Sequence, residues 1–344
     1  MKPITIIGGG LAGLTLGIAL RKEGVPVTIY EAGQYPRHRV CGEFLSGEGL
    51  EILRGWGIGD AAMREGAREA KTVKWYAEDT VTEVMSLPKP ALCISRYRLD
   101  GILAEMFVKM GGHLLTGSRY TGDYGQGVVR ATGRQVQTEA EGWRWIGIKA
   151  HATGVTLEAD LEMHLRADAY VGMCQVENDR TNICGLFRTK EPIGELKTRW
   201  EGLLLGGKNY TLTKKLKNVT FDKESLSFVA GLPIKSFQND DIGVLSVGDS
   251  SAMIPPVTGN GMSLAVESGR LASEAILGYS MAERDWGATQ ALVHQSYVRR
   301  YGGRLRWAGW LQEGVFHPLT RKILVRSVAK IPGLFRWGFG VTRE

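Results

Sequence analysis

A glycine-rich turn between an apolar run and a helical pattern is the feature that most constrains this chain. The run ITII, residues Ile4–Ile7, leads directly into GGGLAG and then into apolar residues at helical spacing. Gly8, Gly10 and Gly13 fit the pattern G-x-G-x-x-G, which allows a tight turn, close approach of the backbone to a pyrophosphate, and close packing of helix on strand. The helix N-terminus adds N–H groups and a positive dipole. This segment therefore predicts a strand, helix, strand unit that binds a dinucleotide.

The second strand of this unit, in VPVTIYE, ends at Glu31. A carboxylate at this position accepts hydrogen bonds from an adenosine ribose and repels a 2′-phosphate. We therefore expect FAD or NAD at this site in preference to NADP.

A second glycine-rich stretch, SVGDSSAMIPPVTGNGMSLAVESG, occupies residues 246–269 and again leads from a strand through a loop into a helix. Asp249 is placed to hydrogen-bond a ribityl hydroxyl, and the free N–H groups of the helix can hold the anionic pyrimidine edge of a flavin. Taken alone, the stretch also fits an ordinary loop before a capped helix. The residues predicted to bind the cofactor here are Gly248, Asp249, Pro256, Gly259, Asn260, Gly261 and Met262.

Three motifs together resemble those of a large flavoprotein superfamily. GGGLAG with Glu31, the ATGR turn at Ala131–Arg134, and VGDSSAMIPPVTGNGMSLA resemble the FAD motifs of the superfamily that includes aromatic hydroxylases, flavin halogenases and geranylgeranyl reductases. The resemblance extends to about residue 290 and implies a noncovalent FAD. By position it also implies that Arg98, in the SRYRLD helix, reaches the phosphate and ribityl region; the alternative is an ordinary arginine near a helix N-terminus.

The predicted fold class is α/β (α+β), with a Rossmann-like FAD-binding domain interleaved with an antiparallel-sheet substrate domain and a helical C-terminus. Several β-rich runs between Trp143 and Phe187 are separated by turns at hairpin spacing, which favours the antiparallel sheet. The resemblance implies that this sheet covers the isoalloxazine. We expect the FAD-binding domain at 1–70, 95–140 and 240–290, the substrate domain at 71–94 and 141–239, and a basic helical segment at 291–344.

A cysteine follows the nucleotide-binding unit in YPRHRVCGEFLSGEGL, residues Tyr35–Leu50. Aromatic hydroxylases usually carry arginine and glycine here, whereas VCGEFLS most resembles the geranylgeranyl reductase branch, in which a cysteine lies close to the flavin ring. The resemblance implies Cys41 as the catalytic residue, with its thiol as a general acid. Cys41 could instead shape the pocket, tune the flavin, or pack as a small hydrophobe. For Glu43 we expect a structural role in the turn.

The resemblance favours an FAD-dependent oxidoreductase that reduces a carbon–carbon double bond of a hydrophobic substrate, isoprenoid or polyketide-like, by flavin hydride transfer. The alternative within the fold is an FAD-dependent monooxygenase that hydroxylates an aromatic or polyketide substrate. A non-catalytic lipid-binding escort is the alternative from another class. The prenyl reductase signature is absent from AYVGMCQVENDRTNICGLF, and Trp143 and Trp145 are not followed by the isoleucine and proline of halogenases. With no second glycine-rich Rossmann pattern, the reductant is NAD(P)H that docks transiently or a protein electron donor.

The formal net charge of +7 arises near the end of the chain, where ten Arg or Lys residues after position 296 face only Glu313 and Glu344. In HPLTRKILVRSVAKIPGLFRWGFG, the cations Lys322, Arg326 and Lys330 lie roughly opposite the apolar residues Leu324, Val328, Ile331 and Phe335. Such a basic amphipathic helix is typical of a membrane interface. The alternative is a helix that packs its apolar side on the protein and leaves its cations in water. No recognised module accompanies the charge, so we expect no nucleic acid partner.

The start of the chain lacks the pattern of a signal peptide, and no window is apolar enough to cross a membrane. The four cysteines lie far apart and form no CxxC pair, which favours free thiols in a reducing compartment. We therefore expect a cytoplasmic protein, peripheral at the membrane if the basic helix binds there. Five of the six histidines, His113, His151, His164, His294 and His317, show no metal-ligand spacing, so no metal site is predicted.

Overall fold

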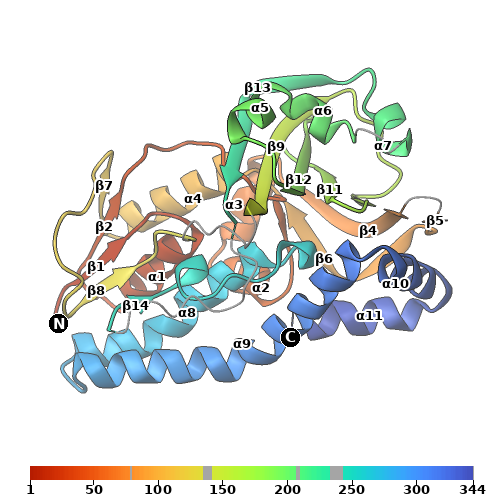
Figure 1. The fold of residues 1–344 in the computed structure, drawn as a ribbon. Helices are drawn as coiled ribbons and strands as arrows, with labels where there is room; N and C mark the ends of the chain where they lie inside the picture. The colour runs from red at the N-terminus through yellow and green to blue at the C-terminus, as the bar shows by residue number, and fades with distance from the viewer. Residues whose placement is uncertain (78–79, 135–141, 207–209, 233–242, 344) are drawn as a thin grey trace.

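The computed structural model describes residues 1–77, 80–134, 142–206, 210–232 and 243–343. Two sheets organise the molecule, and the long helices α8 (Gly261–Ser280) and α9 (Trp286–Phe316) run along one side of it (Figure 1). The chain passes from the first sheet to the second and back twice, so the predicted interleaved fold class is confirmed. The domain boundaries expected near residues 140 and 240 fall outside the described residues.

The first sheet is parallel, in the order β14-β8-β1-β2-β7. Its strands are β1 (Ile4–Ile7), β2 (Val27–Glu31), β7 (His113–Thr116), β8 (Val128–Arg130) and β14 (Leu245–Ser246). The helix α1 (Leu11–Lys22) packs between α4 (Arg96–Lys109) and α8. Because β1 and β2 are parallel, their carboxyl ends lie at the same edge of the sheet, where open α/β folds bind ligands. Gly8 directly follows β1 and Glu31 is the last residue of β2, so both lie at this edge.

The second sheet is mainly antiparallel, in the order β13-β9-β12-β11-β10-β4-β6-β3, with β5 paired to β4 and a parallel pairing of β10 with β4. Its strands are β3 (Phe44–Leu45), β4 (Arg68–Ala77), β5 (Thr80–Val81), β6 (Met85–Cys93), β9 (Arg144–Thr153), β10 (Leu161–Leu165), β11 (Ala169–Gln175), β12 (Thr181–Thr189) and β13 (Thr220–Ala230). The strands β3, β4 and β6 come from the N-terminal part of the chain, so this sheet also joins distant segments.

Short helices complete both layers. The helices α2 (Glu48–Gly55) and α3 (Ile58–Arg64) belong to the first layer, and α5 (Ile193–Thr198), α6 (Trp200–Leu204) and α7 (Tyr210–Lys215) to the second. Buried Leu196, Trp200 and Leu204 pack with side chains of β9 and β12 in one apolar cluster. Burial of such side chains contributes roughly 2 kcal/mol each, so α5 and α6 hold the outer part of the second sheet.

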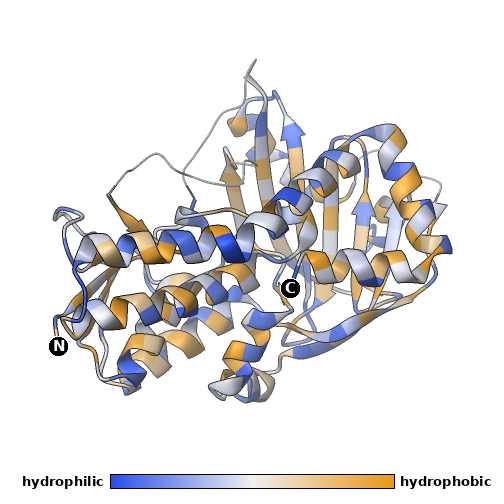
Figure 2. Cartoon of the chain, turned by 90° about the horizontal axis from the view of Figure 1, so that it is seen from below, coloured by the Kyte–Doolittle hydropathy of each residue, from blue (hydrophilic) through white to orange (hydrophobic). Residues whose placement is uncertain are grey.

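The predicted basic helix is two helices that pack on the body of the protein. The helix α10 (Pro318–Lys330) ends before α11 (Pro332–Val341), which begins at a proline. Figure 2 shows hydrophobic and hydrophilic residues alternating along these helices. Three of the ten cations after position 296 are buried, namely Arg304 of α9, Arg321 of α10 and Arg343. Arg304 pairs with Glu267 at 2.6 Å, and Arg321 donates to the carbonyl oxygen of Val315 at 3.1 Å. Of the helices in the described residues, none is long and apolar enough to cross a membrane.

Candidate functional site

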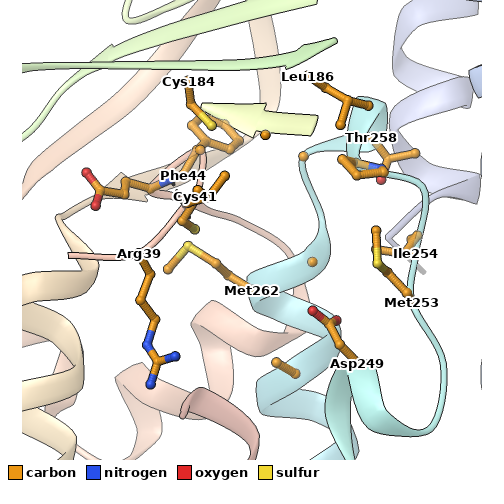
Figure 3. Close-up of a pocket in the computed structure, with 18 of the residues that line it drawn as sticks. Arg39, Cys41, Phe44, Cys184, Leu186, Asp249, Met253, Ile254, Thr258 and Met262 are labelled. Carbon is orange, nitrogen blue, oxygen red and sulfur yellow. Dashed lines mark hydrogen bonds between the residues drawn. The ribbon is translucent and has the colours of Figure 1, made fainter. Parts of the chain in front are cut away.

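A cavity of about 1200 Å³ opens where the two sheets meet. One part is lined by the carboxyl ends of β1 and β2 and by the starts of α1 and α8, and another by side chains of the second sheet. Figure 3 shows Cys41 and Met262 beside each other, with Cys184 and Leu186 above them and Asp249 below. Nine of the predicted site residues line this cavity: Gly8, Gly10, Glu31, Cys41, Asp249, Pro256, Gly259, Gly261 and Met262.

Two helix N-termini open onto the cavity. Gly10 precedes α1 and Asn260 precedes α8, and in neither of these described helices does a side chain cap the first turn. A Cβ built on Gly10 or Gly261 would meet no atom within 4 Å. The backbone at both helix starts is therefore open to close approach by a ligand, and the N–H groups of a helix N-terminus suit a pyrophosphate at α1 and the pyrimidine edge of a flavin at α8.

The other two glycines of the first motif have packing roles. Gly8 has φ = 110°, in the left-handed region that favours glycine, and a Cβ there would overlap the carbonyl oxygen of Ala131. A Cβ on Gly13 would overlap the carbonyl oxygen of Gly8. Gly13 thus does not line the cavity but sets the close approach of α1 to the turn that does.

Glu31 lies at the cavity edge with both carboxylate oxygens engaged. They accept the backbone N–H groups of Gly9 at 2.9 Å and Gly33 at 2.8 Å, and Arg37 pairs with the carboxylate at 2.6 Å. Burial opposes the charge, but the Gly33 N–H and the arginines Arg37 and Arg39 outweigh it and lower the pKa of Glu31. Glu31 is therefore ionised and holds the glycine turn as well as facing the cavity.

Asp249 follows β14 and is half-buried beside the cavity. Burial raises its pKa, against the opposing charges of Arg134 and Arg96. Its predecessor Gly248 has φ = 63° and faces α1, where a Cβ would lie 2.7 Å from that of Ala12. Gly248 is thus a packing residue that turns Asp249 toward the cavity.

Two predicted cofactor residues lie elsewhere. Arg98 is exposed and pairs with Glu65 at 3.3 Å, because it lies on the outer side of the first turn of α4; Arg96, two residues earlier, lines the cavity instead. The Asn260 side chain is buried and donates to the carbonyl oxygen of Thr342 at 2.7 Å. Asn260 therefore joins the α8 loop to the segment after α11.

Cys41 is half-buried and opens on the cavity. The backbone N–H of Glu43 lies 3.4 Å from its Sγ. Burial raises the pKa of the Cys41 thiol, although the positive charge of Arg96 acts in the opposite direction. At neutral pH the thiol therefore carries its proton.

A buried ionic network lies directly behind the cysteine turn. Glu43 is fully buried with φ = 53°, and its carboxylate accepts from His151 Nε2 at 2.6 Å, Lys149 Nζ at 3.2 Å and the backbone N–H of Arg96 at 3.0 Å. Burial would raise the pKa of Glu43, but the His151 hydrogen bond and the Lys149 charge outweigh it and lower that pKa. Lys149 Nζ also lies 3.1 Å from Nδ1 of His38.

The side chains of His38, Glu43 and His151 bring three potential metal-ligand atoms within 4.8 Å of one another. The Lys149 ammonium lies between two of them, 3.2 Å from Glu43 Oε1 and 3.1 Å from His38 Nδ1. Because a positive charge already faces the carboxylate, we describe this cluster as an ion-pair network rather than a metal site.

We expect Glu43→Gln to lower the free energy of unfolding by about 3 kcal/mol, since it leaves the buried Lys149 without its carboxylate. A pKa depressed by folding stabilises the protein above the unfolded value, about 4.3, and this gain is lost as the pH falls below it. The difference between wild type and variant should therefore shrink below about pH 4. Urea unfolding at pH 7 and at about pH 3 measures both, with the exposed Glu51→Gln as a control; equal stability at pH 7 would contradict the network.

The part of the cavity away from the helix N-termini is apolar. Its walls come from the second sheet and from the helices α9, α10 and α11, and include Trp75, Leu161, Met163, Leu186, Phe228, Leu311, Val315, Leu324, Val328 and Phe335. Three residues predicted for a membrane-facing side, Leu324, Val328 and Phe335, thus face the cavity, while Ile331 is exposed. In the described part of the chain, these three apolar residues of α10 and α11 therefore enclose a binding site, so their pattern does not support the membrane interpretation.

Sequence reasoning missed the network and the arginines that serve the site. Lys149 and His151 alternate within the apolar run WIGIKAHA, so both point to the same face of β9. Two ionisable residues on one face of a buried strand are a detectable signal, because such groups need partners. Arg39 and Arg96 carry no comparable signal, since arginines near a turn or a helix start are common.

Comparison with known proteins is consistent with this geometry. Residues 1–141 match the family described as FAD binding domain. The 6-methylpretetramide 4-monooxygenase of Streptomyces rimosus is 26% identical over 133 residues, 37% of this chain and 32% of that protein. Conditioned medium factor receptor 1 of Dictyostelium discoideum is 23% identical over 87% of this chain and 66% of its own length. The chain thus matches about a third of the first relative and about two thirds of the second.

Solved structures share the whole fold at low sequence identity. The flavin-dependent brominase Bmp2 has a TM-score of 0.77 at 18% identity, covering 98% of this chain and 92% of that one. A geranylgeranyl bacteriochlorophyll reductase-like protein from Thermoplasma acidophilum has 0.75 at 17%, covering 95% and 91%. PqsL, a probable FAD-dependent monooxygenase from Pseudomonas aeruginosa, has 0.69 at 14%, covering 92% and 97%. Residues 1–141 therefore match an FAD-binding family, with FAD as the cofactor, and the chain as a whole shares the fold of these solved structures.

Proposed function

We propose that this protein reduces a carbon–carbon double bond of a hydrophobic substrate, isoprenoid or polyketide-like. Bound FAD, once reduced, supplies a hydride. The single observation that carries the proposal is that Cys41 lines the cavity next to Met262 of the α8 start, with its thiol pKa raised by burial (Figure 3). Reduction of an isolated double bond needs a proton on the carbon that does not receive the hydride.

Cys41 Sγ is the group we assign to that proton transfer. A thiol whose pKa is raised by burial keeps its proton until a stronger base, such as a developing carbanion, approaches it. The thiolate left behind is stabilised by the nearby positive charge of Arg96 and by the N–H of Glu43. The Glu43 network holds this turn in place, since the Glu43 carboxylate is bonded to β9 and to the start of α4.

The apolar cavity walls favour a hydrophobic substrate and keep water from the reacting carbon. They leave few polar groups to orient a charged substrate. Trp75 is an exception: its Nε1 is buried without a hydrogen-bond partner among the described residues, and the ring lines the cavity. A single acceptor oxygen on the substrate would satisfy it.

Anaerobic single-turnover measurements test the proposal. The purified FAD-bound protein is reduced with dithionite, or with NADH or NADPH to identify the donor, and mixed without oxygen with a panel of isoprenoid and polyketide-like alkenes. We expect the flavin absorbance to return with formation of the saturated product for at least one class. Failure of every alkene to reoxidise the flavin, while oxygen and the same compounds give hydroxylated product, would reject the reductase. A chain that binds no FAD would favour the binding-protein alternative.

A monooxygenase is the second candidate, and the similarity of 37% of the chain to 6-methylpretetramide 4-monooxygenase favours it. In that case a dry, orienting cavity is the main requirement of the chain, and the Cys41 proton is not needed. Oxygen consumption in step with product, with one oxygen atom incorporated from ¹⁸O₂, distinguishes hydroxylation from reduction.

A further inference from the structure

A buried cation lies beside the loop that opens α8. Arg343 follows α11, is 7% exposed and lines the cavity together with Thr258 and Gly259. Its guanidinium donates to the carbonyl oxygen of Thr258 at 2.8 Å and to Ser46 Oγ at 2.8 Å, and lies 3.7 Å from the centre of the Phe339 ring. Three separate segments therefore hold this side chain rigidly.

Among the described residues, no carboxylate pairs with Arg343. The nearby acid Glu267 is bonded to Arg304, at 2.6 and 3.1 Å. Burial and the charge of Arg304 lower the pKa of Arg343 to about 9, so the group is still charged at neutral pH. A buried charge without a counter-charge is costly, and a nearby negative charge would be stabilised strongly.

Hydrogen bonds to other segments of the chain hold the loop before α8, residues 257–261, in place. Asn260 Nδ2 donates to the carbonyl oxygen of Thr342 at 2.7 Å, and the backbone N–H of Val257 donates to Gln312 Oε1 at 3.3 Å. Gly259 and Gly261 line the cavity. The loop predicted to hold the pyrimidine edge of the flavin and the Arg343 side chain thus border the same cavity.

We propose that Arg343 provides the positive charge that stabilises the reduced, anionic form of bound FAD and so raises its reduction potential. Oxidised FAD takes two electrons and one proton from the reductant, and near neutral pH the resulting negative charge resides on the pyrimidine ring. A fixed positive charge at this side favours the anion over the neutral oxidised form, because little water screens it. The proposal rests on the FAD cofactor and holds for a reductase or a monooxygenase alike.

The test is the two-electron potential of FAD bound to purified protein, measured anaerobically against a reference dye. In Arg343→Gln we expect the equilibrium to shift about tenfold toward oxidised FAD, which is about 30 mV for a two-electron couple. The matched control is Arg336→Gln on the exposed side of α11, which should keep the wild-type potential. An unchanged potential in Arg343→Gln would overturn the proposal.

Arg343→Lys separates charge from packing and covers the case in which the glutamine variant does not fold. Near pH 7 we expect a potential close to wild type. Because a buried lysine loses its proton more readily than arginine, the potential should then fall below that of wild type as the pH rises. A folded lysine variant whose potential matches that of the glutamine variant at pH 7 would show that the charge does not act on the flavin.

Discussion

Gly13→Ala will yield a protein that purifies without FAD, with an affinity for added FAD lowered about a thousandfold or more, which corresponds to about 4 kcal/mol. The physical reason is local. The new methyl group would overlap the carbonyl oxygen of Gly8 and lie 3.2 Å from Ala131 Cβ, so α1 must move away from the turn that its N-terminus completes. Titration of the apoprotein with FAD, followed by flavin fluorescence, measures the loss.

Gly101→Ala is the matched control, because a Cβ at this position of α4 would meet no atom within 4 Å. Replacing glycine with alanine inside a helix stabilises it by about 1 kcal/mol. The control should bind FAD as wild type does and unfold at slightly higher denaturant. Normal FAD binding by Gly13→Ala would show that the glycine turn does not hold the cofactor.

Cys41→Ala should lower the rate of double-bond reduction about a thousandfold, or about 4 kcal/mol, within the range for loss of a general acid. FAD binding should be nearly unchanged, since the thiol lies at the apolar side of the cofactor region. The rate is measured by stopped-flow reoxidation of the reduced protein with an alkene that reoxidises the flavin in the single-turnover experiment. Measuring the reoxidation rate as a function of solvent viscosity and pH establishes that the chemical step, and not binding or release, limits this rate.

The comparison variant is Cys93→Ala, which removes a buried thiol on β6 outside the cavity lining. It should lose some stability and keep the rate. A Cys41→Ala protein that reduces the alkene at the wild-type rate would leave Cys41 with a packing role. If the same variant also hydroxylates with oxygen, the monooxygenase becomes the better assignment.

Much of the cavity lining at the helix N-termini was predictable because it is built from contiguous residues. Gly8 and Gly10 act through their own backbone next to the strand and helix that they join, and so do Gly259 and Gly261. Chain direction and turn geometry place such groups whatever the rest of the fold does. For Arg98, the helix start was predicted correctly, but residues within one helical turn point in different directions. Arg98 pairs with Glu65 outside the cavity, and Arg96 lines the cavity instead.

The apolar cavity wall and the ionic network depended on segments far apart in the chain. Glu43 meets Lys149 and His151 only because the turn after β2 lies against β9. The amphipathic pattern after residue 317 predicted an apolar side correctly, but a pattern says nothing about what that side covers, and here it covers the cavity.

By itself, then, the sequence determined the interleaved fold class, the FAD cofactor and the backbone groups predicted to hold it, because those depend on short segments with their own geometry. Only the tertiary structure decided which buried charged side chains lie next to one another. It pairs Glu43 with Lys149, and it brings Arg343 to the α8 loop about eighty residues before it. Burial fixes such pairings, since a charge removed from water must find a partner in space, and a partner in space need not be near in sequence.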